Sequence, residues 1–67
     1  MEISTGQAAQ LVPVSTETLR SWCERGLLTH RRVGLRGTYQ IDVESLRKLA
    51  NELGYRFDDE VAQALVP

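Results

Sequence analysis

Apolar residues near the start of the chain recur at the spacing of a short helix that a proline ends. Ser4 is followed three residues later by Gln7, the arrangement of a capping box, in which each side chain accepts from the other residue's backbone N–H. Small apolar residues from Ala8 to Val12 then form a face suited to close packing against another helix. Pro13 lacks a backbone donor and restricts the residue before it, so we expect the helix to end there.

A second helical pattern begins just after this proline. Ser15 is a preferred N-cap residue, and Leu19 and Trp22 recur behind it at helical spacing. Gly26 stands where a glycine in the left-handed conformation commonly ends a helix. Two helices joined by about three residues must cross steeply, so we predict a helix-turn-helix over residues 4–26.

Residues 29–41 change to the pattern of a small β-hairpin. The first part has a strand-like composition, and β-branched and aromatic residues recur between Thr38 and Ile41. The turn between the two strands, residues 34–37, begins and ends with glycine. A hairpin that follows a recognition helix is called a wing.

Two further helices are predicted after the wing. Asp42 is a suitable N-cap for residues 42–53, where apolar side chains from Val43 to Leu53 form one stripe and a glycine follows. A short C-terminal helix is expected over residues 58–65, because acidic residues at its start match the positive end of the helix dipole. The expected inner face of this last helix comprises Val61, Ala64 and Leu65.

Composition and hydropathy place the chain among small globular proteins. Its 67 residues suffice for one domain, and 42% hydrophobic with 25% charged residues is typical of a folded chain. It has no apolar run of about 18 residues that would cross a membrane and no signal-peptide pattern at its start, so we expect a cytoplasmic protein without membrane contact. The expected fold class is mostly α with a small β-hairpin wing.

The reactive side chains argue against catalysis and metal binding. Cys23 is the single cysteine and His30 the single histidine, so an internal disulfide and a zinc site with several such ligands are excluded. Cys23 stands next to Trp22 in a helical pattern, where a thiol usually behaves as a small buried hydrophobe. No phosphate-binding glycine loop or metal motif is present, so we expect neither an enzyme nor a cofactor.

The charged residues are unevenly distributed, although the formal net charge is only -1. The stretch 18–40 holds five arginines against a single acid, Glu24, and most other acids follow it. Arginine neutralises DNA phosphates, and its planar guanidinium also matches the acceptor edge of guanine. A local basic face can bind nucleic acid even on a mildly acidic protein, so the stretch favours DNA binding over a solvated surface without a partner.

These elements together resemble the winged helix-turn-helix of MerR-type regulators and of the related excisionase-like DNA-binding modules. The matching stretches are ISTGQAAQL, VPVSTETLRSWCERGLL, VESLRKLA and the wing with Gly34, Arg36, Gly37 and Tyr39, which together cover about residues 3 to 50. The resemblance implies sequence-specific binding of double-stranded DNA, with the second helix in the major groove and the wing on the flanking backbone and minor groove.

On the second helix, the resemblance implies an exposed face that meets DNA. Thr16 and Glu17, near the helix start, are candidates to contact base edges, and Thr18 and Arg20 would contact phosphate or a base. For Glu17, three roles remain open: acceptance of a hydrogen bond from cytosine, repulsion of non-specific DNA, and pairing with Arg20. The residues that the resemblance implies in the core are Leu19, Trp22 and Leu27.

On the wing, the resemblance implies contacts with the DNA backbone. Arg31, Arg32 and Arg36 would hold the flanking phosphates, with Arg36 at the tip reaching the minor groove. Tyr39 would pack the wing and offer its hydroxyl to a phosphate. The full set of expected DNA-binding residues is Thr16, Glu17, Thr18, Arg20, Ser21, Glu24, Arg31, Arg32, Arg36 and Tyr39.

The chain also departs from these families. Pro13 stands in the turn where glycine is usual, and Gly37 and Thr38 occupy places where many relatives carry an arginine pair before the wing tyrosine. MerR-type regulators have a long dimerisation helix and often an effector domain, for which this chain has no room. We therefore expect no small-molecule effector.

Four functions remain open at this point. The first, which we favour, is a small transcriptional regulator, and the second is an excisionase, a recombination directionality factor that binds tandem sites and bends DNA. The third is a protein-interaction adaptor without DNA binding, and the fourth is the DNA-binding piece of a transposase or terminase. The expected partners are double-stranded DNA, further copies of the chain in cooperative arrays, and an integrase or RNA polymerase.

Overall fold

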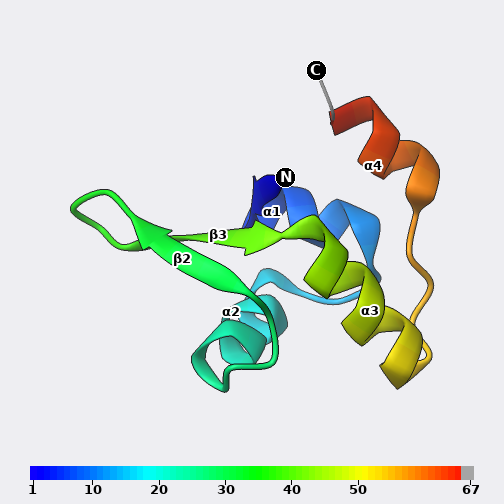
Figure 1. Cartoon of the computed structure of the whole chain (residues 1–67), viewed down its shortest axis with the longest axis horizontal. Coiled ribbons are helices and arrows are strands. Elements are labelled where there is room, and N and C mark those ends of the chain that lie inside the picture. Colours follow the sequence, from blue (N-terminus) through cyan, green and yellow to red (C-terminus); the bar gives the residue numbers. More distant parts are fainter. Residues whose placement is uncertain (66–67) are drawn as a thin grey trace.

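Four short helices and three strands make up the computed structural model, which describes residues 1–65 (Figure 1). Helices make up most of this secondary structure and the strands form one small sheet, so the expected fold class, mostly α with a small β wing, is confirmed. The elements are β1 Glu2–Ser4, α1 Thr5–Leu11, α2 Thr16–Glu24, β2 His30–Val33, β3 Thr38–Asp42, α3 Val43–Leu53 and α4 Asp59–Leu65.

The three strands form an antiparallel sheet in the order β1-β3-β2, and its β2–β3 hairpin projects from the helices as a wing (Figure 1). In this sheet Ile3 of β1 lies opposite Ile41 of β3, and Arg32 of β2 lies opposite Tyr39. The hydrophobic pattern does not predict β1, because three residues are too few to show an alternation. This strand depends on its long-range pairing with β3.

Capping residues start the first two helices where the sequence predicts. The Ser4 side chain accepts from the Gln7 N–H at 3.1 Å and the Gln7 side chain accepts from the Ser4 N–H at 3.0 Å, which confirms the capping box. Ser15 starts α2 by accepting from the Thr18 N–H at 3.2 Å. Gly26 follows α2 with a φ of 74°, which is the left-handed conformation expected there.

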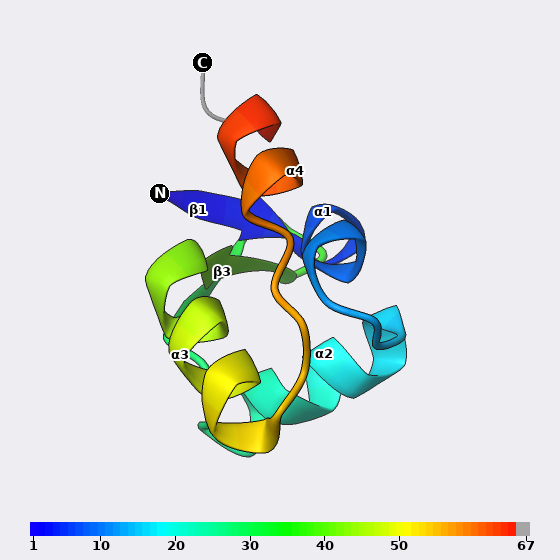
Figure 2. The same ribbon diagram turned by 90° about the vertical axis from the view of Figure 1, so that its right-hand side faces the viewer.

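Aspartate side chains start the last two helices. Asp42 accepts from the backbone N–H of Ser45 at 3.0 Å, and Asp58 accepts from that of Val61 at 3.2 Å. The segment between α3 and α4 runs alongside α1 (Figure 2), where the Asp58 N–H donates to the Leu11 carbonyl at 2.8 Å. α3 and α4 therefore occupy the stretches expected to be helical, each with an aspartate immediately before it.

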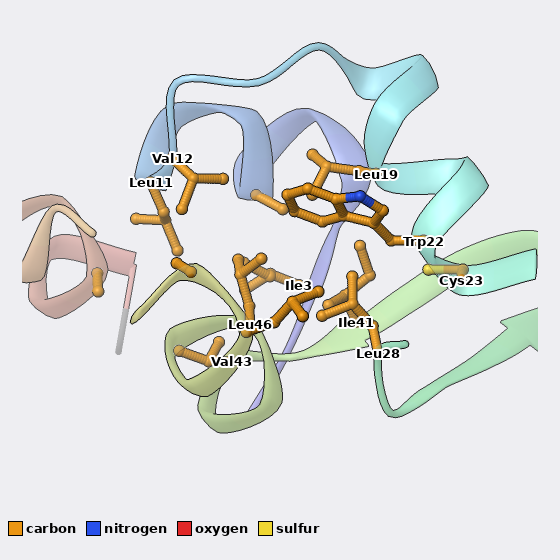
Figure 3. Close-up of a cluster of buried hydrophobic side chains, with 14 residues drawn as sticks. Ile3, Leu11, Val12, Leu19, Trp22, Cys23, Leu28, Ile41, Val43 and Leu46 are labelled. Carbon is orange, nitrogen blue, oxygen red and sulfur yellow. The ribbon is translucent and has the colours of Figure 1, made fainter. Parts of the chain in front are cut away.

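The hydrophobic core lies where the helices meet the sheet (Figure 3). Ile3, Leu19 and Ile41 are almost completely buried. Trp22 is buried as predicted, and its ring centroid lies 5.9 Å from that of Tyr55. The full core comprises Ile3, Ala8, Leu11, Val12, Leu19, Trp22, Cys23, Leu28, Ile41, Val43, Leu46, Leu49, Ala50 and Ala62.

Three expected core positions are wrong. Leu27 is 45% exposed, because the left-handed glycine before it turns the chain so that Leu28 enters the core instead. Leu53 is 51% exposed, since it is the last residue of α3, where the chain leaves the helix. Ala64 is exposed as well, because α4 docks through Ala62.

Candidate nucleic-acid interface

α2 has a buried face and a face open to solvent. Leu19 and Trp22 point into the core (Figure 3), which leaves the polar side of the helix outward. Of the expected DNA-binding residues on α2, Glu17, Arg20 and Glu24 are exposed. The expected DNA-binding residues that lie half-buried on α2 are Thr16, Thr18 and Ser21.

The first turn of α2 carries the residues expected to contact base edges. Thr16 and Glu17 directly follow the N-cap Ser15. Thr18 is partly committed to the cap, because its hydroxyl lies 3.0 Å from the Ser15 hydroxyl in addition to the backbone bond. A DNA contact by Thr18 would therefore compete with its role in starting the helix.

The wing ends in a glycine-framed turn. Gly34 and Gly37 have φ values of 81° and 65°, which is the left-handed region that glycine enters without steric strain. The Gly37 N–H donates to the Gly34 carbonyl at 3.1 Å. Leu35 and Arg36, between them, are held at the tip with ordinary negative φ values.

An interlocked set of side chains supports this turn. Arg32 Nε donates to the Gly37 carbonyl at 3.2 Å, and the guanidinium carbon lies 5.4 Å from the Tyr39 ring centroid. The His30 ring meets the Tyr39 ring edge to face, with centroids 5.3 Å apart. Because Arg32 both stacks and hydrogen-bonds, its guanidinium is oriented before any ligand arrives.

α2 and the wing together enclose an open groove of about 400 Å³. The Tyr39 hydroxyl spans it, donating to Glu24 Oε1 of α2 at 3.5 Å, which is a long hydrogen bond. Five of the expected DNA-binding residues therefore meet at one surface, although they come from α2 and from both strands and the turn of the wing. The groove is lined by Thr5, Arg20, Glu24, Arg32, Arg36, Gly37, Thr38 and Tyr39.

Arg31 lies apart from this groove. Neighbouring strand residues point to opposite faces of a sheet, and Arg32 shares its face with Tyr39, which lies directly opposite. Arg31 instead makes an ion pair with Glu2, in which both Nε and Nη2 lie 2.7 Å from Glu2 Oε1. Its expected phosphate contact stays a prediction, and it would require Arg31 to give up this partner.

A comparison with protein families identifies the fold. The sequence model of a family described as a helix-turn-helix domain matches residues 2–54, which contain α1, α2, the wing and α3. The chain belongs to the helix-turn-helix domain family. Searches of curated proteins and of solved structures found no match. Membership in the family supports DNA binding by this chain, and α4 lies outside the matched part.

Three groove residues of the helix-turn-helix domain were not among the expected DNA-binding residues: Thr5, Gly37 and Thr38. Thr5 begins α1, and it reaches the groove because β1 pairs with β3 and so brings the start of α1 beside the wing. Nothing in the local pattern signals this. Gly37 and Thr38 occupy the places where many relatives carry an arginine pair, and both line the groove.

The single thiol of the helix-turn-helix domain lies outside the groove. Burial raises the pKa of the Cys23 thiol, and the nearby negative charge of Glu24 raises it further. Because a raised pKa lowers the thiolate fraction, Cys23 is a poor nucleophile in the folded protein. Within residues 1–65, no cluster of side chains suited to a metal ion occurs, and no helix is long and apolar enough to cross a membrane.

Proposed function

We propose that this helix-turn-helix domain binds double-stranded DNA with sequence specificity and acts as a small transcriptional regulator. In this proposal α2 enters the major groove and the β2–β3 wing lies on the flanking backbone and minor groove. The observation that carries it is the convergence of Arg20, Arg32 and Arg36 around one groove. A phosphate backbone that follows this groove would meet cations from both elements.

Both the charge of the site and its geometry support contact with phosphate. Arg32 is held over Tyr39 and against the Gly37 carbonyl, so less side-chain freedom is lost when it contacts a phosphate. Arg20 is exposed on the opposite wall, on the helix that would enter the major groove. In the proposal, arginines of the wing and of α2 therefore bind the DNA backbone on either side of the contacted bases and fix the position of the protein on the duplex.

The distribution of acids supports one orientation on DNA. Asp59 and Glu60 lie in the first turn of α4, and both views place α4 at the opposite end of the molecule from α2 (Figures 1 and 2). Asp59 is paired with Arg47 at 2.9 Å. Phosphates would repel the α4 end, so the charge pattern favours an approach through α2 and the wing.

Fluorescence anisotropy with a labelled random duplex pool, measured across a salt series, tests the proposal. Three to five arginine–phosphate contacts predict a log–log slope of about −3 to −5. Arg36→Ala is expected to weaken binding to all sequences and to reduce the slope by about 1. Arg56→Ala is the matched control, because Arg56 is also exposed but lies on the segment between α3 and α4.

Each outcome of this experiment has a distinct meaning. Equal effects of Arg36→Ala and Arg56→Ala would show that only net charge matters and that the wing does not contact DNA. Absence of binding at low salt would overturn the proposal and leave a protein-interaction adaptor as the better reading. A small effect of Arg31→Ala would agree with its pairing to Glu2.

An excisionase role is the second candidate on this fold. It is favoured by the separation of charge, because the acidic start of α4 could meet an exposed arginine outside the groove, such as Arg31, on a copy bound at the next site. Selection of bound duplexes separates the two roles. A regulator is expected to select single defined sites, whereas an excisionase selects tandem sites and binds them cooperatively. A pull-down with RNA polymerase or an integrase would identify the protein partner.

A further inference from the structure

Leu35 at the wing tip is the most exposed large hydrophobic residue among residues 1–65. Its exposure is 109% of the reference value, whereas the other exposed large hydrophobic side chains lie between 39% and 51%. Single exposed apolar residues are common on proteins and need no special role. Leu35 differs in two ways. Its side chain is fully exposed, so packing within the fold does not account for it, and the residues around it in the wing include arginines but no acid.

The turn presents Leu35 on a supported structure. The hydrogen bond between Gly37 N–H and the Gly34 carbonyl closes the turn, and Arg32 Nε donates to the Gly37 carbonyl from the strand beside it. The tip is also the part of the wing farthest from the helices (Figure 1). A side chain at the tip can therefore contact a part of a binding partner that the helices do not reach.

The charged residues near Leu35 indicate which kind of binding partner its side chain contacts. Arg36 is its immediate neighbour, and residues 29–41 contain three arginines and one histidine but no acid. Phosphates on both sides of a narrow groove attract such a hairpin, whereas an apolar protein surface offers nothing to its cations. The combination of an apolar tip and flanking arginines therefore matches the DNA minor groove.

We propose that Leu35 is an apolar wedge that enters the minor groove next to the site occupied by α2, partly unstacks one base step and bends the DNA. This inference rests on the proposed function, because it requires the wing to lie on DNA. Apolar side chains inserted between base steps bend duplexes toward the major groove. Pyrimidine–purine steps unstack most easily. The wedge would therefore make the protein prefer such a step at a position of the DNA site where it forms no hydrogen bond to a base.

The test uses a duplex with one selected site, end-labelled for fluorescence energy transfer. Wild-type protein is expected to shorten the end-to-end distance, and Leu35→Ala is expected to abolish most of that change. Its affinity should fall about tenfold, which corresponds to about 1.4 kcal/mol. The salt slope should stay unchanged because no charge is removed. Leu35→Met, which keeps a long apolar side chain, should retain the bend.

The matched control is Leu53→Ala, which also removes an exposed leucine, at the end of α3. It is expected to bind and bend DNA like the wild type. Replacing a pyrimidine–purine step beneath the wing by a stiff A-tract step should reduce affinity in the wild type and much less in Leu35→Ala.

The outcomes separate this inference from the proposed function. If wild-type protein binds without bending, or Leu35→Ala bends the duplex as the wild type does, the wedge is refuted while DNA binding stands. If Leu35→Ala loses only cooperativity on tandem sites, Leu35 contacts a neighbouring protein and the wedge is again refuted. Absence of any salt-dependent binding by the wild type overturns the proposed function and the wedge together.

Discussion

Replacement of Gly37 by alanine separates the proposed role of the wing in DNA binding from its role in folding. Gly37 has a φ of 65°, a conformation that destabilises a residue with a Cβ by about 1–2 kcal/mol. A Cβ there would also lie 2.7 Å from Arg32 Nη2 and 2.9 Å from Arg32 Nε. These atoms end a flexible side chain, so Arg32 is expected to move away from the Gly37 carbonyl and from the Tyr39 ring.

Gly34 provides the matched control at the other end of the same turn. Its φ is 81°, but an added Cβ would meet no atom within 4 Å. Gly34→Ala therefore introduces backbone strain without moving Arg32. Both variants should lower the free energy of unfolding by about 1–2 kcal/mol. They should differ from each other by at most about 1 kcal/mol, the net contribution of one hydrogen bond.

Two measurements compare the variants. Urea unfolding followed by the fluorescence of Trp22, the single tryptophan, gives the free energy of unfolding. Anisotropy under conditions where both variants are folded gives the affinity for DNA. We expect Gly37→Ala to bind DNA about tenfold more weakly than Gly34→Ala, or about 1.4 kcal/mol, because the proposed contact of Arg32 with phosphate would be lost.

A double-mutant cycle shows whether Arg32 is the cause. In an Arg32→Ala background, Gly37→Ala and Gly34→Ala should have the same DNA affinity, because the displaced side chain is already absent. Equal affinities in the wild-type background would refute the reasoning that Arg32 is positioned by the wing turn. A persistent difference in the Arg32→Ala background would show that Gly37 acts through another group.

Three further predictions concern the core, the thiol and base recognition. Leu46→Ala should lower the free energy of unfolding by about 2–5 kcal/mol in urea titration, because Leu46 is fully buried. The Cys23 thiol, with its raised pKa, should react with a thiol reagent much more slowly in the folded protein than in urea at neutral pH, and equal rates would contradict its burial. Glu17→Ala should change the preferred sequence in a selection experiment, and an unchanged preference would show that Glu17 does not contact bases.

Local features of the fold could be predicted because each depends on residues close together in the chain. The Ser4–Gln7 capping box and the Ser15 cap involve partners three residues away. The left-handed conformation of Gly26 and the glycine-framed turn of the wing also follow from residue type and local spacing. The arginine-rich stretch and its coincidence with α2 and the wing were likewise visible in the order of residues.

Long-range features could not be predicted in the same way. β1 exists only through its pairing with β3, and this pairing brings Thr5 to the groove. Leu27 and Leu28 are indistinguishable by type, yet the turn after α2 buries only Leu28. In each case the deciding contact joins parts of the chain that no local pattern connects.

Arg31 and Arg32 show most clearly which features the sequence determines and which the tertiary structure decides. The sequence determined that two adjacent arginines of a strand would point to opposite faces of a sheet, because side chains alternate along every strand. Only the register of β2 against β3 and the packing of the sheet on the helices decided which one faces α2. Arg32 lies opposite Tyr39 and lines the groove, whereas Arg31 binds Glu2, a partner 29 residues away.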